Sequence, residues 1–137
     1  MKSPEQLVAD RLKDSAIVAA ILGDRVYPVM APASAALPFA TWRRSSVQRE
    51  MTLGGPAAGA TVTLTVDMYD TTYSAVRELA DRCREVLHGF GGSLGDWIFV
   101  RNVTLLNEFD GFVQLAGGEM PPVYSVTQTY TVLWQET

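Results

Sequence analysis

The most regular pattern of hydrophobic and polar positions lies in residues 61–68, where the two kinds of side chain alternate strictly. The apolar positions are Val62, Leu64, Val66 and Met68, and the polar positions are Thr61, Thr63, Thr65 and Asp67. Alternation with a period of two residues is typical of a strand that has one buried face and one face in water. We therefore predict a strand from Val62 to Met68 in a half-buried sheet.

The pattern then changes to the period of a helix over residues 71–87. The apolar positions recur at spacings of three and four residues, and they are Val76, Leu79, Ala80, Cys83, Val86 and Leu87. Asp70 is the predicted N-cap, and the opposite side of the helix offers the charge pairs Arg77–Asp81 and Glu78–Arg82 at i,i+4 spacing. We expect this helix to lie across the buried face of the sheet.

The N-terminal part of the chain predicts two short helices. Ser3 as N-cap, Pro4 in the first turn and Gln6 form a start signal for a helix that continues to about Lys13. A second helix is predicted from Ala16 to Leu22, and Gly23 is the residue expected to end it. The predicted buried side chains are Leu7, Val8, Leu12, Ile17, Ile21 and Leu22.

Further extended segments surround these elements. Residues 25–28 predict a short strand, with Pro28 at a strand end or a sheet edge because proline lacks an N–H. Longer strands are predicted for residues 39–51, 97–106 and 125–134. Segments rich in glycine, proline or alanine predict loops at 29–37, 53–59, 89–95 and 107–122. The element order α-α-β-β-β-α-β-β, with helices segregated to one face, predicts the α+β class.

Composition adds limits to this outline. The chain has 137 residues and a formal net charge of -4, so we expect one domain over residues 1–137 and no strong attraction to nucleic acid. The closest approach to a basic patch is Arg43, Arg44 and Arg49, which fits a solvated strand edge or a subunit contact. No apolar run reaches the roughly 18 residues of a transmembrane helix, and the N-terminus does not resemble a secretory signal.

Candidate reaction chemistry is sparse. His88, the single histidine, follows a predicted helix end, where it suits a capping role. Cys83, the single cysteine, falls on an apolar helix face, which indicates a buried thiol in a reducing cytoplasm. The glycines of residues 89–95 do not form a phosphate-binding fingerprint, because Leu94 stands at the last glycine position. The carboxylates Asp67, Asp70, Glu108 and Asp110 form no marked pair, so no catalytic, cofactor-binding or metal-binding residue is predicted.

Three short motifs follow one another along the chain. They are Gly23-Asp24-Arg25-Val26-Tyr27-Pro28, then Leu37-Pro38-Phe39, and then a strand that runs through Tyr69-Asp70 into a helix. In this order and spacing, from Leu7 to Trp134, the chain resembles the tail-terminator (tail-completion) proteins of long-tailed bacteriophages. The resemblance implies an α+β domain with a mainly antiparallel sheet of about four strands and with helices packed on one face.

The resemblance also implies a structural virion protein rather than an enzyme. Such a protein would form a homohexameric ring that caps the tail tube, ends tail polymerisation and joins the tail to the neck of the head. Its implied partners are further copies of itself, the major tail-tube protein and a head or neck connector protein. DNA would pass through the lumen without sequence-specific binding, no membrane or cofactor would be involved, and assembly in the host bacterial cytoplasm would precede a place in the virion.

Two regions are candidates for the contacts of such a ring. The strand at 39–51 loses its alternation beyond Trp42, and the predicted loops at 53–60 and 107–122 combine glycines with apolar side chains. The predicted interface residues are Trp42, Arg43, Arg44, Arg49, Met51, Leu53, Phe109, Phe112 and Leu115. An alternative is that Phe109 and Phe112 pack back onto their own core. Trp42 and Trp134 are the aromatic residues expected to depart most from a core role.

Two other functions fit the same sequence. One is a head-closure or other neck connector protein, which is a close variant of the tail terminator. The other belongs to a different class and is a small cytoplasmic α+β enzyme or ligand-binding module, which a fold of this class does not exclude. Formation of an oligomeric ring would distinguish a tail terminator or neck connector from a small enzyme or ligand-binding module.

Overall fold

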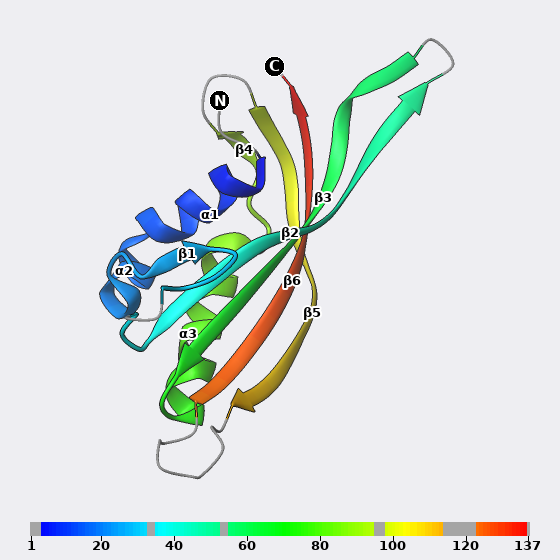
Figure 1. The fold of residues 1–137 in the computed structure, drawn as a ribbon. Coiled ribbons are helices and arrows are strands. Elements are labelled where there is room, and N and C mark those ends of the chain that lie inside the picture. The colour runs from blue at the N-terminus through cyan, green and yellow to red at the C-terminus, as the bar shows by residue number, and fades with distance from the viewer. Residues whose placement is uncertain (1–3, 33–34, 53–54, 95–97, 114–122, 137) are drawn as a thin grey trace.

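The structure is a computed structural model that describes residues 4–32, 35–52, 55–94, 98–113 and 123–136. Its elements, in chain order, are the helices α1 (Pro4–Asp14) and α2 (Ala16–Leu22), the strands β1 (Val26–Pro28), β2 (Phe39–Thr52) and β3 (Gly55–Asp70), the helix α3 (Tyr73–Leu87), and the strands β4 (Gly92–Leu94), β5 (Ile98–Val113) and β6 (Val123–Glu136). Figure 1 shows the helices gathered on one side of a long, twisted sheet.

The sheet confirms the α+β class but has six strands rather than about four. Its strand order is β1-β2-β3-β6-β5-β4, with β1 parallel to β2 and every other neighbouring pair antiparallel. The four long strands are the predicted ones. The two additional strands have three residues each and lie at the two edges, and β4 falls inside the segment predicted as a glycine-rich loop. Pro28 ends the edge strand β1, as predicted.

The long strands continue into the segments predicted as loops, so the first loop prediction was wrong over residues 55–59 and the second over residues 107–113. β3 begins at Gly55 and pairs Gly55 and Pro56 with the end of β2. At this point β3 has β2 as its neighbour on one side, and its pairing with β6 starts only at Gly59, so the edge tolerates a proline. Similarly, β5 covers residues 107–113 of the second predicted loop, and residues 114–122 lie outside the described residues.

The core lies between the helices and one face of the sheet. The predicted inward positions of β3 and of α3 are buried, except that Val86 is only partly buried. In α2, Val18 is fully buried and Ile17 is 50% exposed, so the predicted place of Ile17 in the core was wrong. Trp134 is 4% exposed and belongs to the core, contrary to the prediction, while Trp42 is partly buried against it.

Helix ends agree only in part with the sequence signals. Gly23 ends α2 with a positive φ of 60° and its N–H donates to the Ala19 oxygen, as a helix-ending glycine does. The N-cap of α3 is Thr72 rather than Asp70, because the Thr72 side chain accepts a hydrogen bond from the Ala75 N–H. The Asp70 carboxylate instead accepts from the Thr71 N–H at 2.7 Å, one residue too early to cap the helix.

The motif residues that suggested a known family meet at one end of the sheet. The Tyr27 and Phe39 rings lie 6.2 Å apart, and the Phe39 and Tyr69 rings lie 5.0 Å apart. Arg25 fastens the same region, since its Nε donates to the Pro38 oxygen at 2.8 Å and its Nη2 to the Ile21 oxygen. Residues of the three motifs therefore contact one another and hold β1, β2 and β3 together at this end of the sheet.

Candidate assembly interface

The predicted interface residues of β2 do not form one patch. Arg43 lies on the face of the sheet that the helices leave uncovered, where it forms an ion pair with Asp67 at 3.1 Å. Arg44 lies on the helix side, with its Nη1 3.7 Å from a carboxylate oxygen of Glu5. Arg49 and Met51 belong to the far part of β2, and Leu53 lies outside the described residues.

The second predicted group lies on β5. Phe109 is 58% exposed on the uncovered face, opposite Thr127 of β6, so the alternative that it packs onto its own core was wrong. Phe112 is placed in the same strand by its backbone, and Leu115 lies outside the described residues. Since β3 and β6 separate β2 from β5, the two predicted groups lie near opposite edges of the sheet.

The uncovered face itself is lined by hydroxyl side chains. Cross-strand rows place Thr63 beside Thr131 and Thr131 beside Thr104, and the next row places Thr65 beside Thr129. Large apolar side chains also stand on this face, with Phe99 and Leu133 each 37% exposed and Phe109 58% exposed. Antiparallel sheets commonly pack one face on the core and leave the other in water, and a face of this kind is suited to a water-filled space or to a polar partner.

A buried polar network joins α3 to β5 and β6, and no sequence pattern singled it out. Gln128 is fully buried, and its Nε2 donates to the Ala80 oxygen at 2.9 Å and to the Glu108 carboxylate at 2.6 Å. Its Oε1 accepts a hydrogen bond from the Tyr130 hydroxyl at 2.6 Å. Burial raises the pKa of Tyr130, which keeps this hydroxyl a donor. Gln128 occupies an inward position of β6, so its only sequence signal is a polar residue in an apolar row.

Arg77 extends this network to the surface. Its Nη1 lies 2.6 Å from Glu108 and 3.4 Å from Asp110, so the predicted helix pair Arg77–Asp81 gives way to a contact between α3 and β5. The hydrogen bond with Glu108 raises the pKa of Arg77, and the hydrogen bond with Asp110 raises the pKa of Tyr73. The other predicted pair is also replaced, since Arg82 pairs with Glu85 and Asp81 with Arg84.

His88 and Cys83 both take part in packing and hydrogen bonding within the fold. His88 is the C-cap residue of α3, as predicted, and its Nδ1 accepts a hydrogen bond from the Leu105 N–H at 3.0 Å. Cys83 is fully buried, and burial raises the pKa of its thiol to about 12. Among the described residues no group of three or more His, Cys, Asp or Glu could hold a metal ion.

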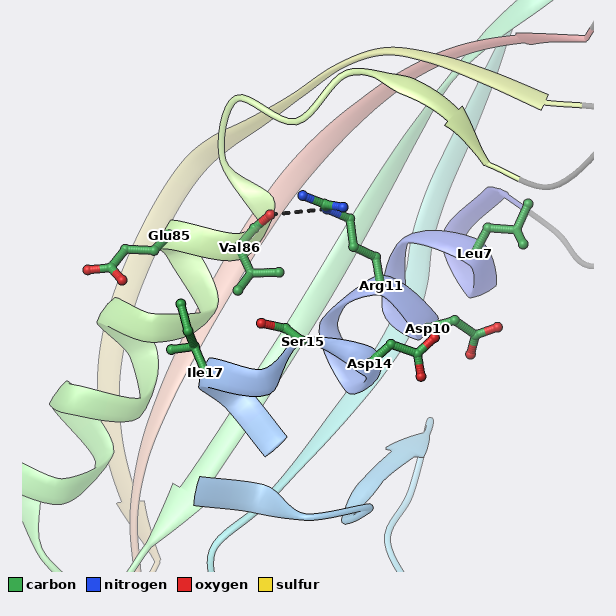
Figure 2. A pocket seen from close by; sticks show the side chains of 8 residues that line it. All are labelled: Leu7, Asp10, Arg11, Asp14, Ser15, Ile17, Glu85 and Val86. Carbon is green, nitrogen blue, oxygen red and sulfur yellow. Dashed lines mark hydrogen bonds between the residues drawn. The ribbon is translucent and has the colours of Figure 1, made fainter. Parts of the chain in front are cut away.

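An open pocket of about 630 Å³ lies where α1, the α1–α2 connection and α3 meet (Figure 2). It is lined by Leu7, Asp10, Arg11, Asp14, Ser15, Ile17, Glu85 and Val86. The Arg11 guanidinium closes one side, with its Nε 3.4 Å from the Val86 oxygen and its centre 3.9 Å from the centre of the Phe90 ring.

None of the helices in the described segments is long and apolar enough to span a membrane.

Comparison with known proteins gives a fold match and a family match for this chain. The fold matches a chain from the virion of a native gene transfer agent particle with a TM-score of 0.76, over 98% of this chain and 96% of that chain, at 14% sequence identity. The comparison with curated proteins gave no match. The family described as "Tail completion protein gp17" matches residues 6–131, which is most of the chain. The chain therefore belongs to the tail completion protein gp17 family.

Proposed function

We propose that this protein is a tail terminator: a structural virion protein that forms a ring on the end of the tail tube, ends tail polymerisation and joins the tail to the neck of the head. The observation that carries the proposal is the family match over residues 6–131. The fold likeness to a chain of a gene transfer agent virion supports it. The 137 residues act as one tail-completion domain, without enzymatic activity, in the assembled virion.

The ring is a homohexamer with the major tail-tube protein on one side and a head or neck connector protein on the other. Trp42, Arg43, Arg44, Arg49 and Met51 all belong to β2 and contribute to one subunit contact from both of its faces and its edge, and Phe109 and Phe112 of β5 contribute to the other. Leu53 and Leu115, which lie outside the described residues, stay predicted interface residues. A contact that uses two different surfaces of each subunit is heterologous, and such contacts close into rings when the rotation permits.

The uncovered sheet face suits the lumen of this ring. Its central rows carry threonine hydroxyls, and its arginine at Arg43 is neutralised by Asp67 at 3.1 Å. Sequence-independent affinity for DNA comes mainly from unpaired cations that displace counterions. A lining of hydroxyl groups with paired charges therefore lets DNA pass without holding it.

The proposal is tested by deleting the gene from its phage or particle and examining the products by electron microscopy. We expect tails of uncontrolled length, together with heads that carry no tail, and both defects should be corrected by the wild-type gene supplied on a plasmid. Tails of normal length with unattached heads would favour a neck connector instead. Particles that are normal in both respects would contradict a role in tail completion.

A further inference from the structure

The sheet has two long open edges, one on each side. β1 pairs with β2 only over Ala40–Trp42, and the Val29 N–H donates to the Trp42 oxygen just beyond. Past that point, residues 43–52 have no outer neighbour within the described residues. β4 likewise pairs with β5 only over residues 98–100. The Gly89 N–H donates a hydrogen bond to the Val103 oxygen, and the His88 ring accepts one from the Leu105 N–H. Beyond them, residues 106–113 have no outer neighbour in the described part of the chain.

Open edges of this length are normally avoided, because their unpaired N–H and C=O groups pair with other strands. We propose that the open edge of β2, residues 43–52, pairs with the open edge of β5, residues 106–113, in the next copy of this chain. The sheets of neighbouring subunits then form one continuous sheet around the ring. This inference deepens the proposed function and rests on it for the ring, while the edge pairing itself is a separate claim.

Strand direction agrees with this pairing. β2 runs opposite to β3, β3 opposite to β6, and β6 opposite to β5, so β2 and β5 of one subunit run in opposite directions. Rotation about a ring axis keeps the tilt and direction of each strand. Hence β2 of one copy meets β5 of the next in the antiparallel sense, which is the geometry of every long strand pair within the subunit.

The positions of the open stretches also agree with a closed ring. Arg43, Thr65, Thr129 and Asn107 share one row across the sheet, and the two stretches extend from this row toward opposite ends. Matching them shifts the next copy by about six or seven residues, which is roughly 21 Å along the strands, against a width of roughly 19 Å for the four long strands. Such a stagger corresponds to a strand tilt of about 45°, at the upper end of the range for closed barrels.

The charges of the two edges are complementary. The open stretch of β2 contains three arginines, Arg43, Arg44 and Arg49, and one glutamate, Glu50. The open stretch of β5 contains two carboxylates, Glu108 and Asp110, and no cation. Arg43 and Arg44 already pair with Asp67 and Glu5, and Glu108 and Asp110 already pair with Arg77, within the subunit. Charge therefore adds only a preference for two unlike edges over two like ones. A second copy of this chain is therefore the partner that fits each edge.

The test is a cross-link between the edges. Ser46 lies opposite Thr63 and Phe109 lies opposite Thr127, so both face the uncovered side, and within one subunit they are roughly 20 Å apart. The double variant Ser46→Cys with Phe109→Cys is treated with a short bifunctional maleimide and analysed on a denaturing gel. We expect a ladder of covalent oligomers that ends at the size of the ring. Cys83 stays unreactive because it is fully buried, so wild-type protein provides the background.

Matched variants make the result specific. Each single-cysteine variant alone should give no ladder, and a mixture of the two should give dimers and nothing larger, because each copy then carries one half of the contact. Ser46→Cys with Asn107→Cys is a second pair on the same edges and should reproduce the ladder. Light scattering on the same samples separates the two claims. Rings without cross-links in both double variants would overturn the edge pairing and leave the ring intact, and monomers in all samples would overturn both.

Discussion

At the scale of single residues, the most informative position is Gln128, a polar side chain in a row of buried apolar ones. It bonds to the backbone of α3, to Glu108 of β5 and to Tyr130 of its own strand. A buried amide with every partner in place holds the helix and the two strands in one arrangement, since any shift would leave a polar atom unpaired. The network thus fixes how α3 sits on the sheet.

Replacing Gln128 tests this role. Gln128→Leu keeps the volume but leaves the Tyr130 hydroxyl unpaired and removes one hydrogen-bond donor from Glu108, and we expect the free energy of unfolding to fall by about 1–3 kcal/mol. Urea unfolding followed by circular dichroism measures the change. Thr131→Val, on the uncovered face of the same strand, is the control and should stay within about 0.5 kcal/mol of wild type. Equal stability of Gln128→Leu and wild type would show that the network contributes nothing.

Cys83 gives the fold a pH dependence of defined sign. Its pKa rises from 9.0 to about 12 on folding because burial disfavours the thiolate, so above pH 9 the unfolded chain loses a proton that the folded chain keeps. Stability is therefore highest below pH 9 and falls between pH 9 and pH 12. Between about pH 7 and pH 10 the unfolding free energy of wild type should drop by about 1.4 kcal/mol more than that of Cys83→Ala, as measured by urea unfolding at the two pH values. Parallel pH profiles would contradict this.

At the scale of elements, the sequence predicted the four long strands and the three helices, because their hydrophobic periods are regular. The alternation of residues 61–68 and the helical spacing from Val76 to Leu87 correspond to buried faces in the structure. The strand ends were missed, because Gly55 and Pro56 are typical of loops yet are tolerated at a sheet edge. The N-cap was misplaced by two residues because Asp70 and Thr72 both have capping side chains.

The candidate interface shows a different limit of sequence reasoning. Arg43 and Phe109 were selected for their residue types, and both are exposed in the structure. They share the uncovered face but stand near opposite edges of the sheet, and this depends on the strand order, which places β3 and β6 between them. Local patterns do not contain this order, since it arises from contacts between residues far apart in the chain. Gln128 was missed for a related reason, because its partners lie on two other elements.

The contact between α3 and β5 is testable at this scale. Arg77 is 2.6 Å from Glu108, which also binds buried Gln128, so Arg77→Ala leaves that carboxylate without its cation. We expect a loss of about 1–2 kcal/mol in unfolding free energy. Arg82→Ala removes an exposed ion pair within α3 and should cost less than about 0.5 kcal/mol. Thermal unfolding of the two variants in parallel decides the matter, and equal shifts in Tm would contradict a special role for Arg77.

At the scale of the whole molecule, opposite charge on two edges makes assembly sensitive to charge reversal. Arg49→Glu turns the open stretch of β2 from basic toward neutral and places an acid near the carboxylates of the neighbouring β5. We expect the protein concentration needed for ring formation to rise by roughly tenfold, which corresponds to about 1.4 kcal/mol per contact. Light scattering over a dilution series measures it. Arg82→Glu, on the outer surface of α3, should leave assembly unchanged, and an equal effect of the two substitutions would indicate a non-specific cause.

The two three-residue strands at the sheet edges bear on the number of subunits in the proposed ring. In the proposed ring, the strand that pairs with β2 would end next to β1, and the strand that pairs with β5 would end next to β4, because β1 covers only Ala40–Trp42 and β4 only residues 98–100. Each short strand is thus an end stop that limits how far an incoming strand can slide. A slide by one residue would turn every side chain to the wrong face, and a slide by two would change the tilt and with it the number of subunits that close the circle. If the proposed edge pairing holds, we therefore expect the lengths of β1 and β4 to limit how many subunits close the ring.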